Sequence, residues 1–277
     1  MNTVTLPSGE RVPALGMGTW YVGDSPARRA DEIAALRAGL DLGATLIDTA
    51  EMYGEGKSES LIGEAIEGRR DEVFLVSKVY PHNATRTGAI AACERSLKRL
   101  RTDRIDLYLL HWRGGVPFEE TLEAFGRLRR DGKIRHFGVS NLDRADMEEF
   151  RDAPGGQGVQ TDQLLYNLTR RGIEWELLPF LRERRIPVMA YSPLEQTRLL
   201  RDRRLVQFAR DHGMTPAQAA LAWLLARDDV IAIPKAASVA HVRENVAAAE
   251  MRLAQAQLDE LDRLFPPPRS AGALEML

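Results

Sequence analysis

Hydrophobic residues recur along the chain in short runs that are separated by longer amphipathic segments. Each run is apolar at nearly every position and rich in Val, Ile, Leu or Phe, a pattern typical of strands buried on both faces of a parallel sheet. The eight runs cover residues 13–17, 45–47, 73–76, 105–110, 134–139, 159–163, 187–190 and 230–233.

The segments between the runs have the three- and four-residue apolar spacing of helices. This spacing predicts helices over residues 31–42, 87–100 and 215–226. Thr215 is suited to cap the last of these, because the next residue is a proline at the first helical position. Eight strand–helix units close a barrel, so we predict an α/β fold, a (β/α)8 TIM barrel.

Two segments lie outside the eight units. Residues 4–12 predict a small N-terminal β-hairpin with Ser8 and Gly9 in its turn. Residues 266–277 begin with three prolines and predict a short, extended C-terminal tail. Since no Pro-, Gly- or Ser-rich linker divides the chain, we expect one domain over residues 1–277.

Composition narrows the class of protein. The 277 residues include 38 Lys and Arg against 40 Asp and Glu, a formal net charge of -2, which provides no electrostatic basis for binding nucleic acid or an acidic membrane. No apolar run approaches a membrane span, and the N-terminus does not resemble a secretory signal. The single cysteine, Cys93, excludes an internal disulfide. We expect a cytoplasmic monomer.

Polar residues stand where the predicted strands end. Because the carboxyl ends of barrel strands meet at one mouth, these residues are expected to converge. In strand order they are Asp48 with Tyr53 shortly beyond it, Lys78, His111, Ser140 and Asn141, Gln163, Tyr191 and Ser192, and Lys235. Each has a structural alternative when taken alone: Asp48 as a helix cap, Lys78 as a solvated loop lysine, His111 as a core histidine.

Taken together, these residue types suit proton transfer from a phenol. An ordinary tyrosine has a pKa of about 10, and a neighbouring ammonium is expected to lower it. An aspartate keeps the lysine charged, and a neutral histidine orients a carbonyl. Such a tyrosine protonates an oxygen that becomes negative, as when a carbonyl receives a hydride from a nicotinamide cofactor.

The motifs that contain these residues resemble those of the aldo-keto reductase family, over nearly the whole chain. Within that family the chain is most similar to small bacterial members associated with the reduction of methylglyoxal and similar aldehydes. The matching motifs are Asp48-Thr49-Ala50-Glu51-Met52-Tyr53-Gly54, Ser77-Lys78, Leu110-His111, Gly138-Val139-Ser140-Asn141, Gln163-Leu164-Leu165-Tyr166-Asn167, Tyr191-Ser192-Pro193-Leu194 and Ile233-Pro234-Lys235.

The resemblance implies NADPH-dependent reduction of small aldehydes and ketones to alcohols. It implies a catalytic tetrad in which Tyr53 is the general acid: Asp48, Tyr53, Lys78 and His111. It implies a cofactor site formed by Thr19, Asp48, Ser140, Asn141, Gln163, Tyr191, Ser192, Leu194, Lys235, Ser238, Glu244 and Asn245. The substrate would contact Trp20, Tyr53, His111 and Trp112. The five histidines lack a metal-ligand spacing, and we expect no metal.

Two departures from the family pattern affect the cofactor and the substrate. The family often has a serine directly after the lysine and an arginine six residues after it, where this chain has Ala236 and His241. NADPH remains the expectation because Lys235 is kept, but NADH use is possible. The short loop over residues 113–118 and the short tail predict a mouth that accepts small or varied aldehydes.

Two other functions compete with a reductase. A barrel lyase would use Lys78 to form a Schiff base with a carbonyl substrate. A non-catalytic, nicotinamide-binding regulatory subunit would keep the cofactor residues and lose turnover.

Overall fold

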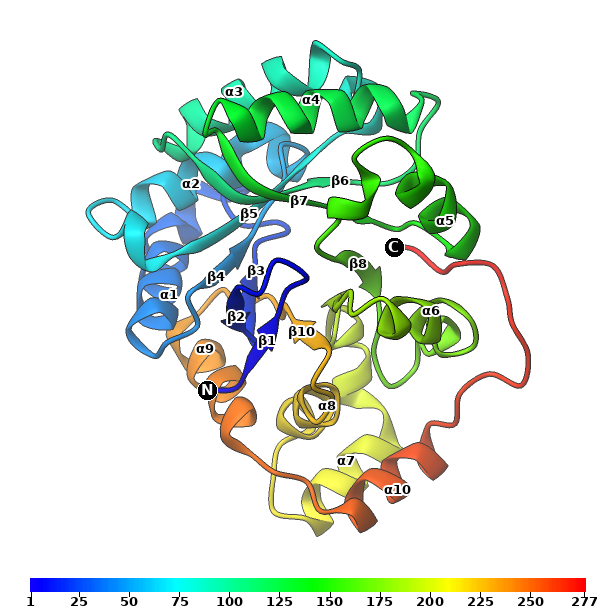
Figure 1. Ribbon diagram of the computed structural model, residues 1–277. Helices are drawn as coiled ribbons and strands as arrows, with labels where there is room; N and C mark the ends of the chain where they lie inside the picture. Colours follow the sequence, from blue (N-terminus) through cyan, green and yellow to red (C-terminus); the bar gives the residue numbers. More distant parts are fainter.

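Eight parallel strands form the centre of the structure, a computed structural model that describes residues 1–277 (Figure 1). Each strand pairs with the next one along the chain. Bridges from Leu15 to Ala232 and from Gly18 to Lys235 join the first strand region to the last. The sheet therefore closes into the predicted TIM barrel. Its strands are β3 (Gly16–Gly18), β4 (Leu46–Asp48), β5 (Phe74–Val79), β6 (Ile105–Leu110), β7 (Ile134–Ser140), β8 (Asp162–Leu165), β9 (Val188–Tyr191) and β10 (Val230–Ala232).

The predicted hairpin is present at the amino end of the barrel. Strands β1 (Thr3–Thr5) and β2 (Arg11–Pro13) pair antiparallel, and Gly9 in the turn has a φ of +87° that L side chains rarely adopt. The backbone N–H of Ser8 donates to Gln160 Oε1 at 2.9 Å, just before β8 begins, which ties the hairpin to the barrel. Because β2 extends to Pro13, the first barrel strand begins at Gly16, later than the run over residues 13–17 predicts.

Helices cover the outside of the barrel (Figure 1). The three predicted helices are confirmed to within two residues at each end, and Thr215 caps its helix by accepting from the N–H of Gln218 at 3.1 Å. None of the helices is both long and apolar enough to cross a membrane. They are α1 (Arg29–Asp41), α2 (Lys57–Ala65), α3 (Gly88–Leu100), α4 (Phe118–Arg130), α5 (Arg144–Asp152), α6 (Leu177–Glu183), α7 (Arg203–Asp211), α8 (Pro216–Leu225), α9 (Val239–Glu250) and α10 (Gln255–Leu264).

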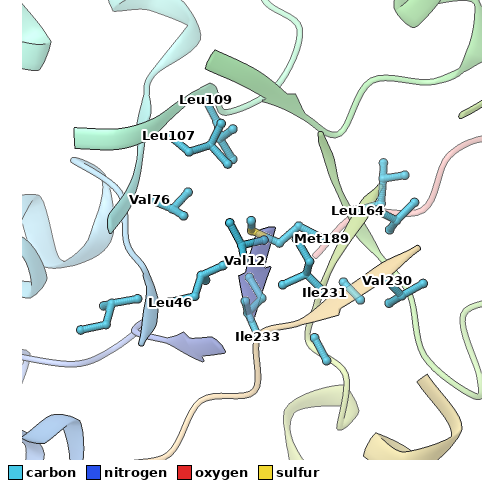
Figure 2. Close-up of a cluster of buried hydrophobic side chains, with 14 of the residues drawn as sticks. Val12, Leu46, Val76, Leu107, Leu109, Leu164, Met189, Val230, Ile231 and Ile233 are labelled. Atoms are coloured by element: carbon cyan, nitrogen blue, oxygen red, sulfur yellow. The ribbon is translucent and has the colours of Figure 1, made fainter. Parts of the chain in front are cut away.

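The barrel strands are buried on both faces, as their continuous apolar runs predict. Every residue of β5 and β6 is buried. Side chains from several strands, among them Leu46, Val76, Leu107 and Met189, are clustered in the core (Figure 2). A barrel filled in this way has no pore, so chemistry is confined to its ends.

One strand differs from its prediction. The run over residues 159–163 places Gln163 at a strand end, whereas β8 begins at Asp162 and continues to Leu165. Gln163 pairs with Ser140, the last residue of β7. Barrel strands are staggered, so a residue inside one strand lies level with the end of its neighbour. Gln163 therefore still reaches the mouth.

Two helical glycines provide a test of how closely α2 packs against α3. A Cβ on Gly63 of α2 would lie 2.7 Å from the carbonyl oxygen of Arg99, whereas a Cβ on Gly126 of α4 would meet only the flexible end of Arg130, at 3.5 Å. We expect Gly63→Ala to lower the free energy of unfolding by about 1–3 kcal/mol because backbone must move. Gly126→Ala, the matched control, should raise it by about 0.5–1 kcal/mol through helix propensity. Urea unfolding measures both, and equal effects would contradict the close α2–α3 approach.

Candidate active site

A fully buried lysine lies at the carboxyl end of the barrel. Lys78 on β5 has no exposed side-chain surface, and its Nζ donates to Asp48 Oδ2 at 2.9 Å, to the carbonyl oxygen of Thr49 at 2.8 Å and to the Tyr53 hydroxyl at 3.0 Å. An ammonium has three protons to donate, and each finds an acceptor here. Lys78 is therefore not the solvated loop lysine considered as an alternative.

Asp48 and Lys78 each favour the charged form of the other. Burial raises the pKa of Asp48, although Lys78 opposes that shift. Burial by itself would lower the pKa of Lys78, but the charge of Asp48 and the contact with Tyr53 outweigh it, and the pKa ends above its ordinary value. Lys78 is thus held as a cation at neutral pH. A charged lysine without solvent access is not a nucleophile, which argues against the Schiff-base lyase.

The pKa of Tyr53 moves opposite to the sequence-based expectation. Burial raises it above 10, and this effect exceeds the lowering by Lys78, while Asp48 adds a further increase. The expectation that the lysine would leave the tyrosine with a lowered pKa is therefore wrong, because it left desolvation out. Tyr53 keeps its proton at neutral pH and is available as a donor.

The turn that carries Tyr53 has an unusual backbone. Tyr53 starts a 3-10 segment, Tyr53–Gly56, in which Gly54, Glu55 and Gly56 all have positive φ. This geometry places the centroid of the Tyr53 ring 4.7 Å from Lys78 Nζ. Glu55 adopts the left-handed region without being glycine, a strain of the kind found at functional sites.

His111 completes the cluster, directly after β6. Its ring lies edge-on to Tyr53, with 5.9 Å between centroids, and contacts Trp112 at 4.8 Å. Burial, helped by the charge of Lys78, lowers the pKa of His111 well below 6.5, so the ring is neutral. Its Nδ1 is buried and has no hydrogen-bond partner within the protein. A neutral imidazole beside a phenol is suited to orienting a carbonyl oxygen.

A layer of amides connects this cluster to β9. Gln163 Nε2 donates to Asp48 Oδ1 at 2.8 Å, and Ser140 Oγ donates to the carbonyl oxygen of Gln163 at 2.9 Å. Asn141 Nδ2 donates to Ser140 Oγ at 3.0 Å, while its Oδ1 accepts from the Tyr191 hydroxyl at 3.0 Å. These side chains therefore fix one another around the barrel mouth.

Two cavities meet at Tyr53. We call the first, of about 300 Å³, the long cavity, and the second, of about 250 Å³, the mouth cavity. Trp20, Tyr53 and Tyr191 line both. The long cavity also contacts Gly18, Thr19, Tyr21, Asp48, Ser192, Pro193, Leu194, Gln196, Thr197, Ile233, Pro234 and Lys235. The mouth cavity also contacts Met52, His111, Trp112, Ser140, Asn141, Gln163, Met276 and Leu277.

The donor set of the long cavity fits a nicotinamide dinucleotide. One end has the aromatic ring of Tyr191 beside the amide layer, and the other end has the ammonium of Lys235. Desolvation, with the nearby charge of Arg28, lowers the pKa of Lys235, while the carboxylates of Glu32 and Asp24 oppose that shift. Stacking and amide hydrogen bonds suit a nicotinamide, and the ammonium of Lys235 suits phosphate.

Three predicted cofactor residues lie on α9 or directly before it and do not line either cavity. Ser238 caps the helix by accepting from the N–H of His241 at 3.3 Å. Asn245 is buried among the helices and Glu244 is partly exposed. The cofactor roles of these three residues remain predictions.

The C-terminal tail forms part of the site, which the sequence pattern does not predict. Met276 and Leu277 line the mouth cavity, so the mouth is not as open as a short-looped barrel would be. Tyr21, Gln196 and Thr197 were also missed on the long cavity. The only sequence signal for the tail is that the chain returns to apolar residues, Leu274, Met276 and Leu277, after its prolines.

Fold and site together define an oxidoreductase barrel, and the chain belongs to the aldo/keto reductase family, whose model matches residues 14–265. It is 52% identical over 271 residues to methylglyoxal reductase YeaE of Escherichia coli (strain K12), covering 96% of this chain and 95% of that protein. It is 34% identical over 267 residues to glyoxal reductase of Bacillus subtilis (strain 168), covering 95% and 92%.

Solved structures agree with this family membership. The crystal structure of an aldo/keto reductase from Klebsiella pneumoniae in complex with NADP and acetate superposes with a TM-score of 0.97 at 49% identity, and covers 100% of this chain and 99% of that chain. A structure of an aldo-keto reductase from Klebsiella pneumoniae in complex with NADPH has the same TM-score, identity and coverage.

Asp162 of β8, whose charged neighbours are Asp143 and Asp146 at the start of α5, provides a pH test of the packing outside the barrel mouth. Both carboxyl oxygens are buried without a side-chain hydrogen-bond partner, and burial, opposed only by the nearby Leu142 backbone N–H, raises the pKa of Asp162 well above 3.8. The unfolded chain ionises at its ordinary pKa, so Asp162 makes folding progressively less favourable as the pH rises from there to the folded pKa. We expect Asp162→Asn to match the wild type in urea midpoint near pH 4 and to exceed it at pH 8.

The exposed Asp152 of α5 supplies the control, because Asp152→Asn should leave the pH dependence unchanged. A gap between wild type and Asp162→Asn that stays constant from pH 4 to 8 would contradict the raised pKa of the buried Asp162.

Proposed function

We propose that this protein reduces small aldehydes and ketones of the methylglyoxal type to alcohols with NADPH. The observation that carries the proposal is a protonated Tyr53, held by a charged and fully buried Lys78, at the junction of two cavities. The names of the relatives support it, because one is a methylglyoxal reductase and another a glyoxal reductase. The cofactors named in the two Klebsiella structures support NADPH.

The proposed cofactor residues line the long cavity and the part of the mouth cavity that adjoins it at Tyr191. Tyr191 provides a face for the nicotinamide ring, and Ser140, Asn141 and Gln163 are placed for its carboxamide. Thr19, Asp48, Ser192 and Leu194 line the path from the ring towards Lys235, which is suited to the 2′-phosphate. When bound, NADPH supplies the hydride.

Tyr53 and its neighbours supply the proton. A carbonyl oxygen gains negative charge as the carbon is reduced, and the Tyr53 hydroxyl protonates it. The phenolate that remains is stabilised by the Lys78 ammonium at 3.0 Å, and Asp48 keeps that ammonium charged. Neutral His111 orients the carbonyl oxygen towards Tyr53.

The mouth cavity suits a small, uncharged substrate. Its walls include Trp20, Trp112, Met276 and Leu277, and no Lys, Arg, Asp or Glu side chain lines it. A volume of about 250 Å³ excludes large substrates unless the tail moves.

Three further expectations from the sequence are kept as proposals. A single domain over residues 1–277 is supported by a hydrophobic core that continues from Val4 of the hairpin to Phe265. A cytoplasmic location is supported by a single, buried Cys93. Gel filtration tests the proposed monomer.

Replacing the general acid tests the mechanism. We expect Tyr53→Phe to lower kcat for methylglyoxal by about 10²–10⁴-fold, since the proton donor is removed. Calorimetric titration should show that NADPH still binds. Tyr108→Phe is the matched control: Tyr108 is buried on β6 with its hydroxyl unpartnered, so its loss should leave kcat unchanged.

The same experiment separates the alternatives. A wild type that binds NADPH without turnover of any aldehyde would favour a regulatory subunit. Borohydride trapping of a substrate adduct on Lys78 would favour the lyase.

Replacing Lys235 tests the cofactor preference. We expect Lys235→Ala to raise the Michaelis constant for NADPH by about 10–100-fold, because one charge-assisted contact is lost. The Michaelis constant for NADH should rise far less. Lys98→Ala, an exposed lysine on α3, should change neither constant. Equal effects of Lys235→Ala on both cofactors would refute its role at the 2′-phosphate.

A further inference from the structure

The loop after β9 holds several residues in a strained conformation beside the long cavity. Ser192, Glu195, Gln196 and Thr197 all have φ between +46° and +73°, although none is a glycine. Ser192, Gln196 and Thr197 line the cavity. L side chains rarely adopt this conformation, so surrounding contacts must hold the loop in place.

The contacts that hold this loop converge on Glu195. Its side chain is only 7% exposed, and it accepts from Asn167 Nδ2 at 2.9 Å and from Arg170 Nη2 at 2.8 Å. Asn167 Nδ2 also donates to the carbonyl oxygen of Ser192 at 3.0 Å. Residues 167–170, which follow β8, therefore clamp the loop that borders the long cavity.

The same Arg170 also holds the C-terminal tail. Its Nη1 donates to Glu275 Oε1 at 2.6 Å, while Nε and Nη2 bind Glu195. Glu275 directly precedes Met276 and Leu277, which line the mouth cavity. The guanidinium thus joins one carboxylate beside each cavity, a geometry that its planar fork of donors permits.

Few other contacts position the tail. It leaves α10, passes around the outside of the barrel and returns to the mouth between α5 and β8 (Figure 1, red). Trp175 Nε1 donates to the carbonyl oxygen of Pro268 at 2.6 Å, and the N–H of Leu277 donates to the Tyr191 hydroxyl at 3.4 Å. A cavity of about 210 Å³ lies against residues 271–275. Leu274 is the tail residue that packs against the hydrophobic core, and the rest of the tail depends on these polar contacts.

We propose that Arg170 is a positioning residue that couples the cofactor loop, residues 192–197, to the wall of the substrate site formed by Met276 and Leu277. The coupling rests on the proposed function, since it takes NADPH as the ligand of the long cavity. NADPH that packs against residues 192–197 restrains Glu195. Arg170 transmits this restraint to Glu275, so cofactor binding strengthens the hold on a substrate wall that the Arg170–Glu275 contact already positions.

Limited trypsinolysis measures the position of the tail without turnover. Arg269 lies in the exposed part of the tail, and cleavage after it releases residues 270–277, which mass spectrometry detects. We expect saturating NADPH to slow this cleavage at least fivefold in the wild type. Glu275→Gln and Arg170→Gln should remove the protection, because each breaks the Arg170–Glu275 contact.

Arg198→Gln is the matched control. Arg198 binds the same Glu195 Oε1, at 3.2 Å, but its side chain is 62% exposed and it makes no contact with the tail. This variant should keep the protection by NADPH. Full protection in Glu275→Gln, or none in the wild type, would overturn the coupling.

Calorimetry keeps the two proposals apart. Titration with NADPH sets the saturating concentration for each variant. A wild type that does not bind NADPH overturns the proposed function itself. A wild type that binds NADPH and reduces methylglyoxal, but whose tail is cleaved at the same rate with and without NADPH, overturns only the role of Arg170.

Discussion

The buried ammonium of Lys78 is the interaction on which the rest of the site depends. A charge without solvent is costly unless it is paired and fully hydrogen-bonded. The barrel meets this condition by placing Asp48 on β4, next to Lys78 on β5, and by adding the Thr49 carbonyl and the Tyr53 hydroxyl as further acceptors. The strained turn at Tyr53–Gly56 is then understandable, because it brings the third acceptor to the ammonium.

The same burial determines how Tyr53 acts. Desolvation outweighs the lysine and keeps the phenol protonated, while the lysine remains at 3.0 Å to stabilise the phenolate once the proton has left. His111 is kept neutral by the same two influences, burial and the nearby ammonium. A dry site thus separates the roles of the groups: one cation, one proton donor and one neutral ring.

Sequence patterns predicted the features that depend on local residue types. Buried parallel strands require apolar runs, so the eight units and the polar residues that end them were recognisable. The place of Gln163 inside β8 was not, because it depends on barrel stagger rather than on residue type. The direction of the Tyr53 pKa shift could not be predicted from sequence either, because it depends on how much solvent distant segments exclude from the hydroxyl.

The tail was missed for a related reason. Nothing in residues 266–277 predicts where they dock. Their position depends on contacts with Trp175, Arg170 and Tyr191, all of which lie far away along the chain. Arg170 shows why this matters for function. A substrate wall attached through a single guanidinium to the cofactor loop can be looser before the cofactor binds and more firmly held once it is bound. A wall built into a barrel strand would be rigid in both states, because the barrel is closely packed throughout.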